Sequence, residues 1–141
     1  MKFWDTSALI AITIDEVHQQ FAIDTLESDD HMAVWWGSSI EYVSAVSRRE
    51  RDGSLAEHEV TQHLAVLEEF AQTWFEVQPS QALKSLAHRL LRVHPLRPAD
   101  SLQLAAAIVS AEGDPTTLDF VGFDERLNRA ASREGFRVLT H

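Results

Sequence analysis

The sequence predicts an α/β protein: a three-layer α/β/α sandwich around a central, mainly parallel sheet of four to five strands. Short apolar runs alternate with amphipathic helical segments, and this alternation is typical of parallel strands joined by helices. The 141 residues contain no internal repeat and no linker rich in Gly, Ser or Pro. We therefore expect a single domain over residues 1–141, with a ligand site outside the carboxyl ends of its strands.

The first half of the chain contains two expected strands and four expected helices. The strands are the apolar runs at 2–4 and 31–35, and the helices cover 6–13, 17–29, 38–51 and 55–73. Asp52 and Gly53 end the third helix, since glycine readily adopts the left-handed conformation that follows a helix. In the fourth helix, Leu64, Leu67 and Phe70 lie on one side, so this helix has an apolar face that could form a dimer interface.

The second half contains three expected strands and three expected helices. The strands lie at 74–77, 118–123 and 136–139, and the helices cover 80–93, 99–112 and 125–133. Pro95 and Pro98 keep residues 94–98 in a loop, and Pro98 suits the first turn of the helix that follows. That helix is rich in Ala and Leu, which predicts that it is buried.

The composition indicates the cellular setting. No apolar run reaches the roughly 18 residues that a membrane-spanning helix needs. Asp5 interrupts the only early apolar stretch, which argues against a signal peptide. The absence of cysteine excludes disulfides and thiolate metal sites and is compatible with a reducing compartment. We expect a cytoplasmic protein with no membrane partner.

The net charge of −10 bears on nucleic-acid binding. Phosphate backbones attract Lys and Arg, so an ordinary nucleic-acid-binding domain is basic. Only Lys2 and Lys84 are lysines, and the other ten of the twelve cations are Arg, which recognises phosphate in a planar, bidentate way. The composition therefore lowers a nucleic-acid hypothesis without excluding a local Arg cluster that makes the contact.

Four acidic residues occur at similar places on this map. Asp5 and Asp124 each end a strand and begin a helix, while Glu41 and Asp100 each lie in the first turn of a helix. Helix starts that follow parallel strands lie at one edge of the sheet, so at least three of the four should gather there, and Asp100 could join them. Asp119 lies near the start of its strand instead, so we expect it at the opposite edge of the sheet with a structural or solvent role.

Each acid alone has a structural explanation. Asp5 and Asp124 suit a helix N-cap, residues 38–41 fit a capping box, and Asp100 favours the helix dipole. Thr6 or Ser7, however, is sufficient to cap the first helix without Asp5. Together, four carboxylates on one rim repel one another unless a cation compensates, and a hard divalent ion such as Mg²⁺ prefers oxygen ligands of this kind. The set therefore favours a metal site.

These acids stand in four motifs of a known family. The run DTSAL at 5–9 resembles the opening motif of PIN-domain nucleases, and SIEY at 39–42 resembles their second. The run RPADSLQLA at 97–105 resembles the third, and VGFDERL at 121–127 the fourth. Order, spacing and length resemble VapC-type toxins, the small PIN ribonucleases of type II toxin–antitoxin pairs. The resemblance covers essentially the whole chain and depends on the four motifs together.

The resemblance implies a PIN-like fold and an endoribonuclease that depends on Mg²⁺ or Mn²⁺. It implies that four catalytic residues hold the metal, directly or through waters: Asp5, Glu41, Asp100 and Asp124. It also implies an RNA substrate, a small cognate antitoxin protein as partner, and a homodimer. Cleavage of DNA by the same site stays an open alternative.

One residue departs from the family pattern. The family usually has Thr or Ser two residues before the fourth acid, and this chain has Gly122. A supporting hydroxyl is therefore missing, which affects the second metal position. The alternative function is a catalytically impaired PIN-like module that binds RNA or a protein without cleavage, although intact acids at all four positions argue against it.

Arginines near the acids are candidates for phosphate contacts. Arg48 and Arg49 follow Glu41 on its helix and are the expected substrate-binding residues. For Arg126 and Arg129, ion pairs on a solvated helix face explain the sequence equally well. The full set of further candidates is Arg51, Arg89, Arg92, Arg97, Arg126 and Arg129.

Overall fold

The centre of the molecule is one five-stranded sheet in which every pair of neighbouring strands is parallel. The computed structural model describes residues 1–14 and 16–141. Its strands are β1 (Lys2–Trp4), β2 (Met32–Trp35), β3 (Phe75–Val77), β4 (Asp119–Val121) and β5 (Arg137–Leu139), in the order β3-β2-β1-β4-β5. Because β2 and β4 lie on opposite sides of β1, the order in which the strands are added to the sheet reverses at β1. In such sheets a crevice forms at the carboxyl edge, where the connections leave to the two sides.

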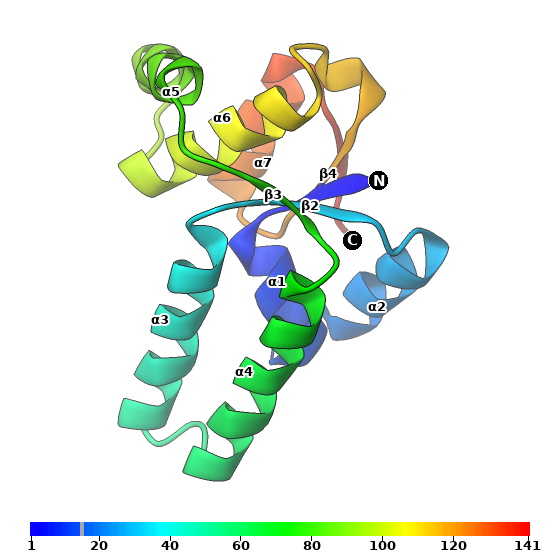
Figure 1. Ribbon diagram of the computed structural model, residues 1–141, viewed down its shortest axis with the longest axis vertical. Coiled ribbons are helices and arrows are strands. Elements are labelled where there is room, and N and C mark those ends of the chain that lie inside the picture. The colour runs from blue at the N-terminus through cyan, green and yellow to red at the C-terminus, as the bar shows by residue number, and fades with distance from the viewer. Residues whose placement is uncertain (15) are drawn as a thin grey trace.

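Helices cover both faces of this sheet, so the expected three-layer α/β/α sandwich is confirmed. One layer holds α1 (Thr6–Thr13), α2 (Gln19–Ser28), α3 (Ser38–Arg51) and α4 (Glu57–Ala71), and the other holds α5 (Gln81–Val93), α6 (Pro98–Ser110) and α7 (Glu125–Glu134). In Figure 1 the first layer lies below the sheet and the second above it, and α3 and α4 extend downward as a helical pair.

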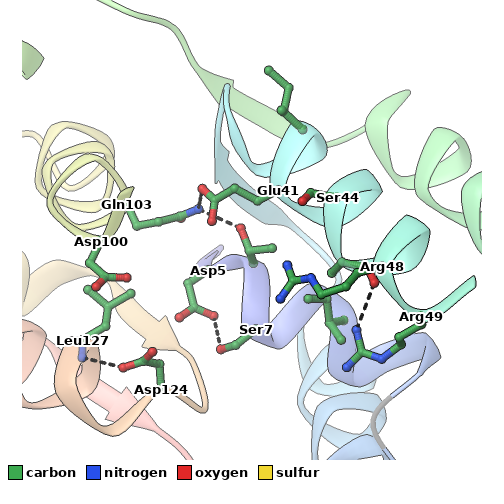
Figure 2. Close-up of a pocket in the computed structure, with 14 residues that line it drawn as sticks. Asp5, Ser7, Glu41, Ser44, Arg48, Arg49, Asp100, Gln103, Asp124 and Leu127 are labelled. Carbon is green, nitrogen blue, oxygen red and sulfur yellow. Dashed lines mark hydrogen bonds between the residues drawn. The ribbon is translucent and has the colours of Figure 1, made fainter. Parts of the chain in front are cut away.

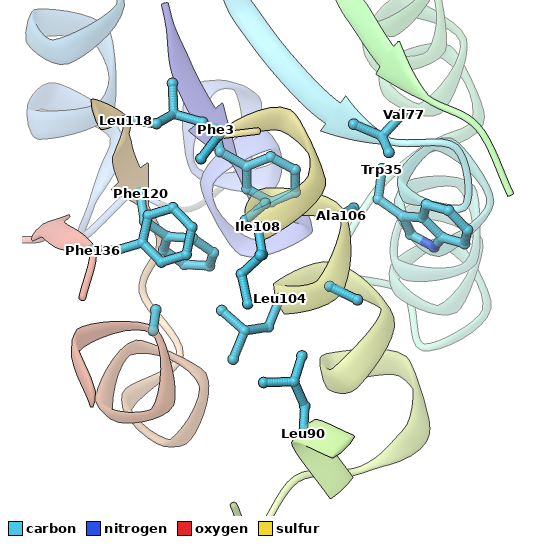
Figure 3. Packing of buried hydrophobic residues seen from close by; sticks show 14 of the residues in the cluster. Phe3, Trp35, Val77, Leu90, Leu104, Ala106, Ile108, Leu118, Phe120 and Phe136 are labelled. Carbon is cyan, nitrogen blue, oxygen red and sulfur yellow. The ribbon is translucent and has the colours of Figure 1, made fainter. Parts of the chain in front are cut away.

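Alternation of side chains along the short strands divides the core into two parts. Phe3 and Phe120 face α5, α6 and α7, where Leu104 and its Ala neighbours on α6 fill the space (Figure 3). Trp4 and Val121, the next residues along, face the layer formed by α1 to α4. Burial on both faces explains why β2 reads as a continuous apolar run.

The expected elements agree with the structure to within a few residues at their ends. The sequence did not predict the 3₁₀ turn at Pro115–Thr117, which joins α6 to β4. The apolar side of α4 packs on the chain's own core through the buried Leu67 and the partly buried Leu64 and Phe70. In the described part of the chain, none of the helices has the length and apolar character that crossing a membrane requires.

Candidate active site

An open pocket of about 550 Å³ lies at the carboxyl edge of the sheet, and all four predicted acids line it. Asp5 follows β1, Asp124 follows β4, Glu41 lies in α3, and Asp100 lies in the first turn of α6. Figure 2 shows their side chains around one space. Asp100 therefore joins the other three, a placement that the sequence left open because α6 does not follow a strand.

Asp5 is the N-cap of α1, so the expectation that Thr6 or Ser7 would cap this helix is wrong. Asp5 Oδ1 accepts a hydrogen bond from the backbone N–H of Ala8 at 2.9 Å and another from Ser7 Oγ at 2.6 Å. Ser7 Oγ in turn accepts from the N–H of Phe123 at 2.9 Å, which ties α1 to the segment between β4 and α7. Capping thus uses one oxygen of the carboxylate and fixes its orientation.

Burial makes Asp5 difficult to ionise. The residue is only 2% exposed. The pKa of Asp5 is raised to about 7, chiefly by burial and also by the carboxylates of Asp124 and Glu41, against the hydrogen bonds from Ser7 and Ala8, which lower it. A buried carboxylate with neighbours of like charge is costly unless a cation approaches it, so this pKa marks a site where a cation would stabilise the charged form.

The carboxylate of Glu41 accepts a hydrogen bond from Gln103 on α6 and takes no part in a capping box. The N-cap of α3 is Gly37, without a side-chain cap, so the capping box expected at residues 38–41 is absent from this described helix. Burial raises the pKa of Glu41, and the carboxylate of Asp100 adds to the effect, whereas hydrogen bonds from Gln103 and Thr6 lower it. The expectation of a structural cap at Glu41 is therefore wrong, and its carboxylate faces the pocket.

Gln103 is a site residue that the sequence analysis missed. It is 2% exposed and lies one turn after Asp100 on α6. Its Nε2 lies 2.8 Å from Thr6 Oγ1, 2.9 Å from Ser38 Oγ and 3.0 Å from Glu41 Oε1, so one amide joins the first turns of α1, α3 and α6. The available signal was a single amide in an otherwise apolar stretch of helix, three residues from an acid and therefore on its face.

Asp100 and Asp124 combine helix-end roles with their place in the pocket. Asp124 caps α7, accepting at Oδ1 from the N–H of Leu127 at 3.0 Å. Asp100 Oδ2 lies 3.4 Å from the N–H of Arg97, a weak contact. Burial raises the pKa of Asp100, and Asp124 raises it further, while Arg97 and Arg126 lower it. The structural and functional explanations of these acids are therefore compatible.

The structure explains why position 122 is glycine. A Cβ on Gly122 would lie 2.8 Å from Asp5 Oδ2 and 2.8 Å from Asn128 Oδ1, closer than side-chain carbons approach. Asn128 Nδ2 donates to the carbonyl of Gly122 at 2.9 Å, and its buried Oδ1 has no hydrogen-bond partner among the described residues. A polar side chain from α7 thus occupies the space beside Asp5 where a hydroxyl at 122 would project.

The tightest group of candidate metal ligands lies elsewhere. Within residues 1–14 and 16–141, the ligand atoms of Asp29, Asp30 and His31 all lie within 4.8 Å of one another. Asp29 already pairs with the N-terminal amine and with Lys2 Nζ at 3.7 Å, which lowers its pKa and explains the group as an ion-pair cluster. The four pocket acids are spaced more widely than this group.

The candidate arginines differ in whether they lie near the acids. Arg48 and Arg49 line the acidic pocket, where the sequence placed them, and Arg49 Nη1 donates to the carbonyl of Ala45 at 3.4 Å. Arg89 is instead bound to Glu134 at 2.7 Å, away from the acids. Asp119 pairs with Arg137 at 2.9 Å, in keeping with the structural role expected for it.

Comparison with known proteins assigns the fold. A chain in a solved toxin–antitoxin complex from Klebsiella pneumoniae is similar, with a TM-score of 0.67 and 15% identity over 99% of this chain and 97% of that one. At this identity the likeness shows the fold alone. No curated protein sequence matches the chain. A family model of the PIN domain matches residues 2–132. The chain therefore belongs to the PIN domain family.

Proposed function

We propose that this protein is a Mg²⁺- or Mn²⁺-dependent endoribonuclease formed by one PIN-like domain over residues 1–141. The observation that carries the proposal is the pocket lined by Asp5, Glu41, Asp100 and Asp124. It lies at the carboxyl edge of the parallel sheet, where the strand order reverses. Membership of the PIN domain family supports it, since such domains are in general nucleases.

The residues present fit a hard divalent cation. All four candidate ligands are carboxylates, and the Oδ2 of buried Asp5 accepts no hydrogen bond within the described residues, so it is free to bind an ion. The acids are spaced too widely for all of them to touch one ion, which suits Mg²⁺ because this ion keeps several of its waters. Raised pKa values at Asp5, Glu41 and Asp100 are the expected property of such a site without its ion.

Each residue has a definite task in this proposal. The four acids hold the metal directly or through waters, and Ser7 and Gln103 orient Asp5 and Glu41. When bound, the ion would polarise the phosphate, lower the pKa of an attacking water and stabilise the leaving oxygen. Arg48 and Arg49 hold the RNA phosphate at the wall formed by α3, as charge-assisted donors.

The biological setting belongs to the same proposal. The similar solved structure is a toxin–antitoxin complex, and the sequence motifs resemble VapC-type toxins. We infer that the protein acts in the cytoplasm as the toxin of such a pair, as a homodimer bound by a small antitoxin. A gene for a small protein next to this one, whose product binds this chain and blocks cleavage, would support this role, and cleavage unaffected by any such neighbour would remove it.

The nuclease proposal has a direct test. Purified protein is incubated with a labelled structured RNA, and with DNA of the same sequence, in Mg²⁺, in Mn²⁺ and in EDTA. We expect RNA cleavage only with metal, and none by Asp5→Asn. Cleavage in EDTA would refute the metal assignment, preferential cleavage of DNA would change the substrate, and tight RNA binding without cleavage would favour the impaired module that Gly122 suggested.

A further inference from the structure

A second pocket, of about 460 Å³, lies beside the acidic pocket and shares two of its residues. Asp100 and Asp124 line both. The rest of the second pocket comes from the loop before α6 and the start of α7, and its lining adds Pro95, Arg97, Glu125, Arg126 and Arg129. The two pockets are therefore neighbours, with Asp100 and Asp124 between them.

The three arginines of this pocket are exposed and available. Arg126 and Arg129 lie three residues apart on α7 and so share one face of the helix, and Arg97 is the N-cap of α6. As far as the structure describes the chain, none of the three forms an ion pair, whereas Arg89 and Arg137 are each bound to a carboxylate. The expectation of ion pairs along the face of α7 is thus not met at Arg126 and Arg129.

The charges around the pocket select its ligand. Asp100 and Asp124 are the acids that would hold the metal, so their charge is compensated within the acidic pocket when it is loaded. Guanidinium groups without an acidic partner bind phosphate oxygens well, in a bidentate manner. The second pocket is therefore suited to a phosphate diester adjacent to the one being cleaved.

The position of the arginines gives the substrate a path. In Figure 2, Arg48 and Arg49 lie on one side of Asp5, on α3, and Asp100 and Asp124 lie on its other side. Arg126 and Arg129 line the second pocket together with Asp100 and Asp124, and they lie on α7, which covers the opposite face of the sheet from α3. A chain of phosphates that crosses the acids would meet arginines on both sides.

We propose that Arg97, Arg126 and Arg129 form a phosphate subsite that holds the RNA backbone on the side of the acids opposite Arg48 and Arg49. This rests on the proposed ribonuclease function and assigns a substrate contact to residues outside the metal site. The competing explanation is that these arginines only balance the charge of Asp100, whose pKa Arg97 and Arg126 lower.

The test measures RNA binding without requiring cleavage. All variants carry Asp5→Asn so that RNA stays intact, and the probe is a fluorescent single-stranded RNA of about 12 nucleotides, titrated from about 50 to about 200 mM salt. The test variant is Arg126→Ala with Arg129→Ala. Its charge-matched control is Lys84→Ala with Arg133→Ala, an exposed lysine and an exposed arginine outside both pockets, the second on the same helix α7.

We expect the test variant to bind about tenfold more weakly at low salt, with a salt slope smaller by roughly 0.7 for each phosphate that the arginine pair no longer neutralises. The control should change affinity less than about twofold. A neutral methylphosphonate is placed at each phosphate linkage of the RNA in turn. It should weaken binding by the parent, which carries Asp5→Asn alone, at one or two linkages, and it should not weaken binding by the test variant at those linkages.

Equal reductions in affinity for the test and control variants, or identical methylphosphonate profiles in parent and test variant, would overturn the subsite. Failure of the parent to bind RNA at all would overturn the subsite too. The two proposals remain separable. If the unsubstituted protein cleaves RNA with metal but the loss of Arg126 and Arg129 does not change RNA affinity, only the subsite is removed. RNA bound through the pair but never cleaved removes only the nuclease function.

Discussion

Gln103 donates from Nε2 to Oε1 of Glu41 over 3.0 Å, and this bond joins α6 to α3 beneath the acidic pocket. The same nitrogen lies within hydrogen-bonding distance of Thr6 and Ser38, and Ser38 is fully buried. The amide thus satisfies a hydroxyl that has no access to water and fixes the rotamer of an acid that we assign to the metal.

Replacing this amide should weaken both the fold and the site. Gln103→Leu keeps the volume but leaves the Ser38 hydroxyl and the Glu41 carboxylate short of a donor, at a cost of about 1–3 kcal/mol in the free energy of unfolding. Mg²⁺ affinity should fall as well. Urea denaturation and Mg²⁺ titration check this, with Gln62→Leu on the exposed side of α4 as control. Equal stability of the two variants would show that the network contributes nothing.

Asp5 should make the metal-free protein less stable as the pH rises. Its pKa is about 7 in the folded chain against an ordinary value of 3.8, so the folded state binds the proton more tightly than the unfolded state. The stabilisation is complete below about pH 4 and is lost as the pH rises through about 7. Asp5→Asn keeps an oxygen for Ser7 and Ala8, so in EDTA it should match the parent near pH 4 and exceed it near pH 8, by up to roughly 4 kcal/mol.

Urea denaturation at both pH values measures this difference, and Mg²⁺ provides the control. At about pH 8 the ion should stabilise Asp5→Asn less than the parent, because the variant lacks one of the four carboxylates that we assign to the metal. A stability difference that does not vary with pH would contradict the burial of an ionisable group at this position.

A side chain at position 122 should destabilise the protein instead of restoring a missing contact. Gly122→Ala places a carbon 2.8 Å from Asp5 Oδ2 and from Asn128 Oδ1, and overpacking of this kind costs about 1–3 kcal/mol. Adding Asn128→Ala removes one of the two close approaches, so the double variant should recover part of the stability. Thermal or urea unfolding of both single variants and the double variant checks this, and strict additivity would show that the two positions do not interact.

Glu134 should stabilise the packing of α5 against α7. Its carboxylate lies 2.7 Å from Nε2 of the buried His94 and 2.7 Å from Arg89, and these partners lower its pKa. Glu134→Ala leaves the imidazole without its partner and should cost about 1–3 kcal/mol. Because the folded pKa is lowered, the parent should lose this advantage as the pH falls below about 4.5. Urea denaturation near pH 7 and pH 4, with the exposed Glu68→Ala as control, checks the prediction.

The alternation of apolar runs and helices was sufficient to predict the layers, but not the strand order. Strands of only three or four residues are too short to carry a pattern that selects a neighbour. The place of Asp100 depends on how α6 packs across the sheet, since this helix starts after a loop. Its approach to Asp124 could therefore be known only from the structure.

Local patterns predicted the acids of the site better than their supporting contacts. Asp5 and Asp124 stand at strand-to-helix junctions, which a sequence displays directly. The bond between Gln103 and Glu41 joins residues 62 positions apart, and the pair formed by Gly122 and Asn128 depends on the path of the chain between β4 and α7. Contacts of this kind leave only an unexplained polar residue in the sequence.

The central claim is that the four pocket acids hold the metal that cleaves RNA, and one comparison tests it most directly. Single-turnover cleavage of a labelled RNA is measured against Mg²⁺ concentration for Asp100→Asn and for Asp119→Asn, which removes a carboxylate at the start of β4, at the other edge of the sheet. We predict that Asp100→Asn loses at least about 100-fold in rate, or requires far more Mg²⁺, while Asp119→Asn cleaves like the parent. Parent-like cleavage by Asp100→Asn at the same Mg²⁺ concentration would contradict the account.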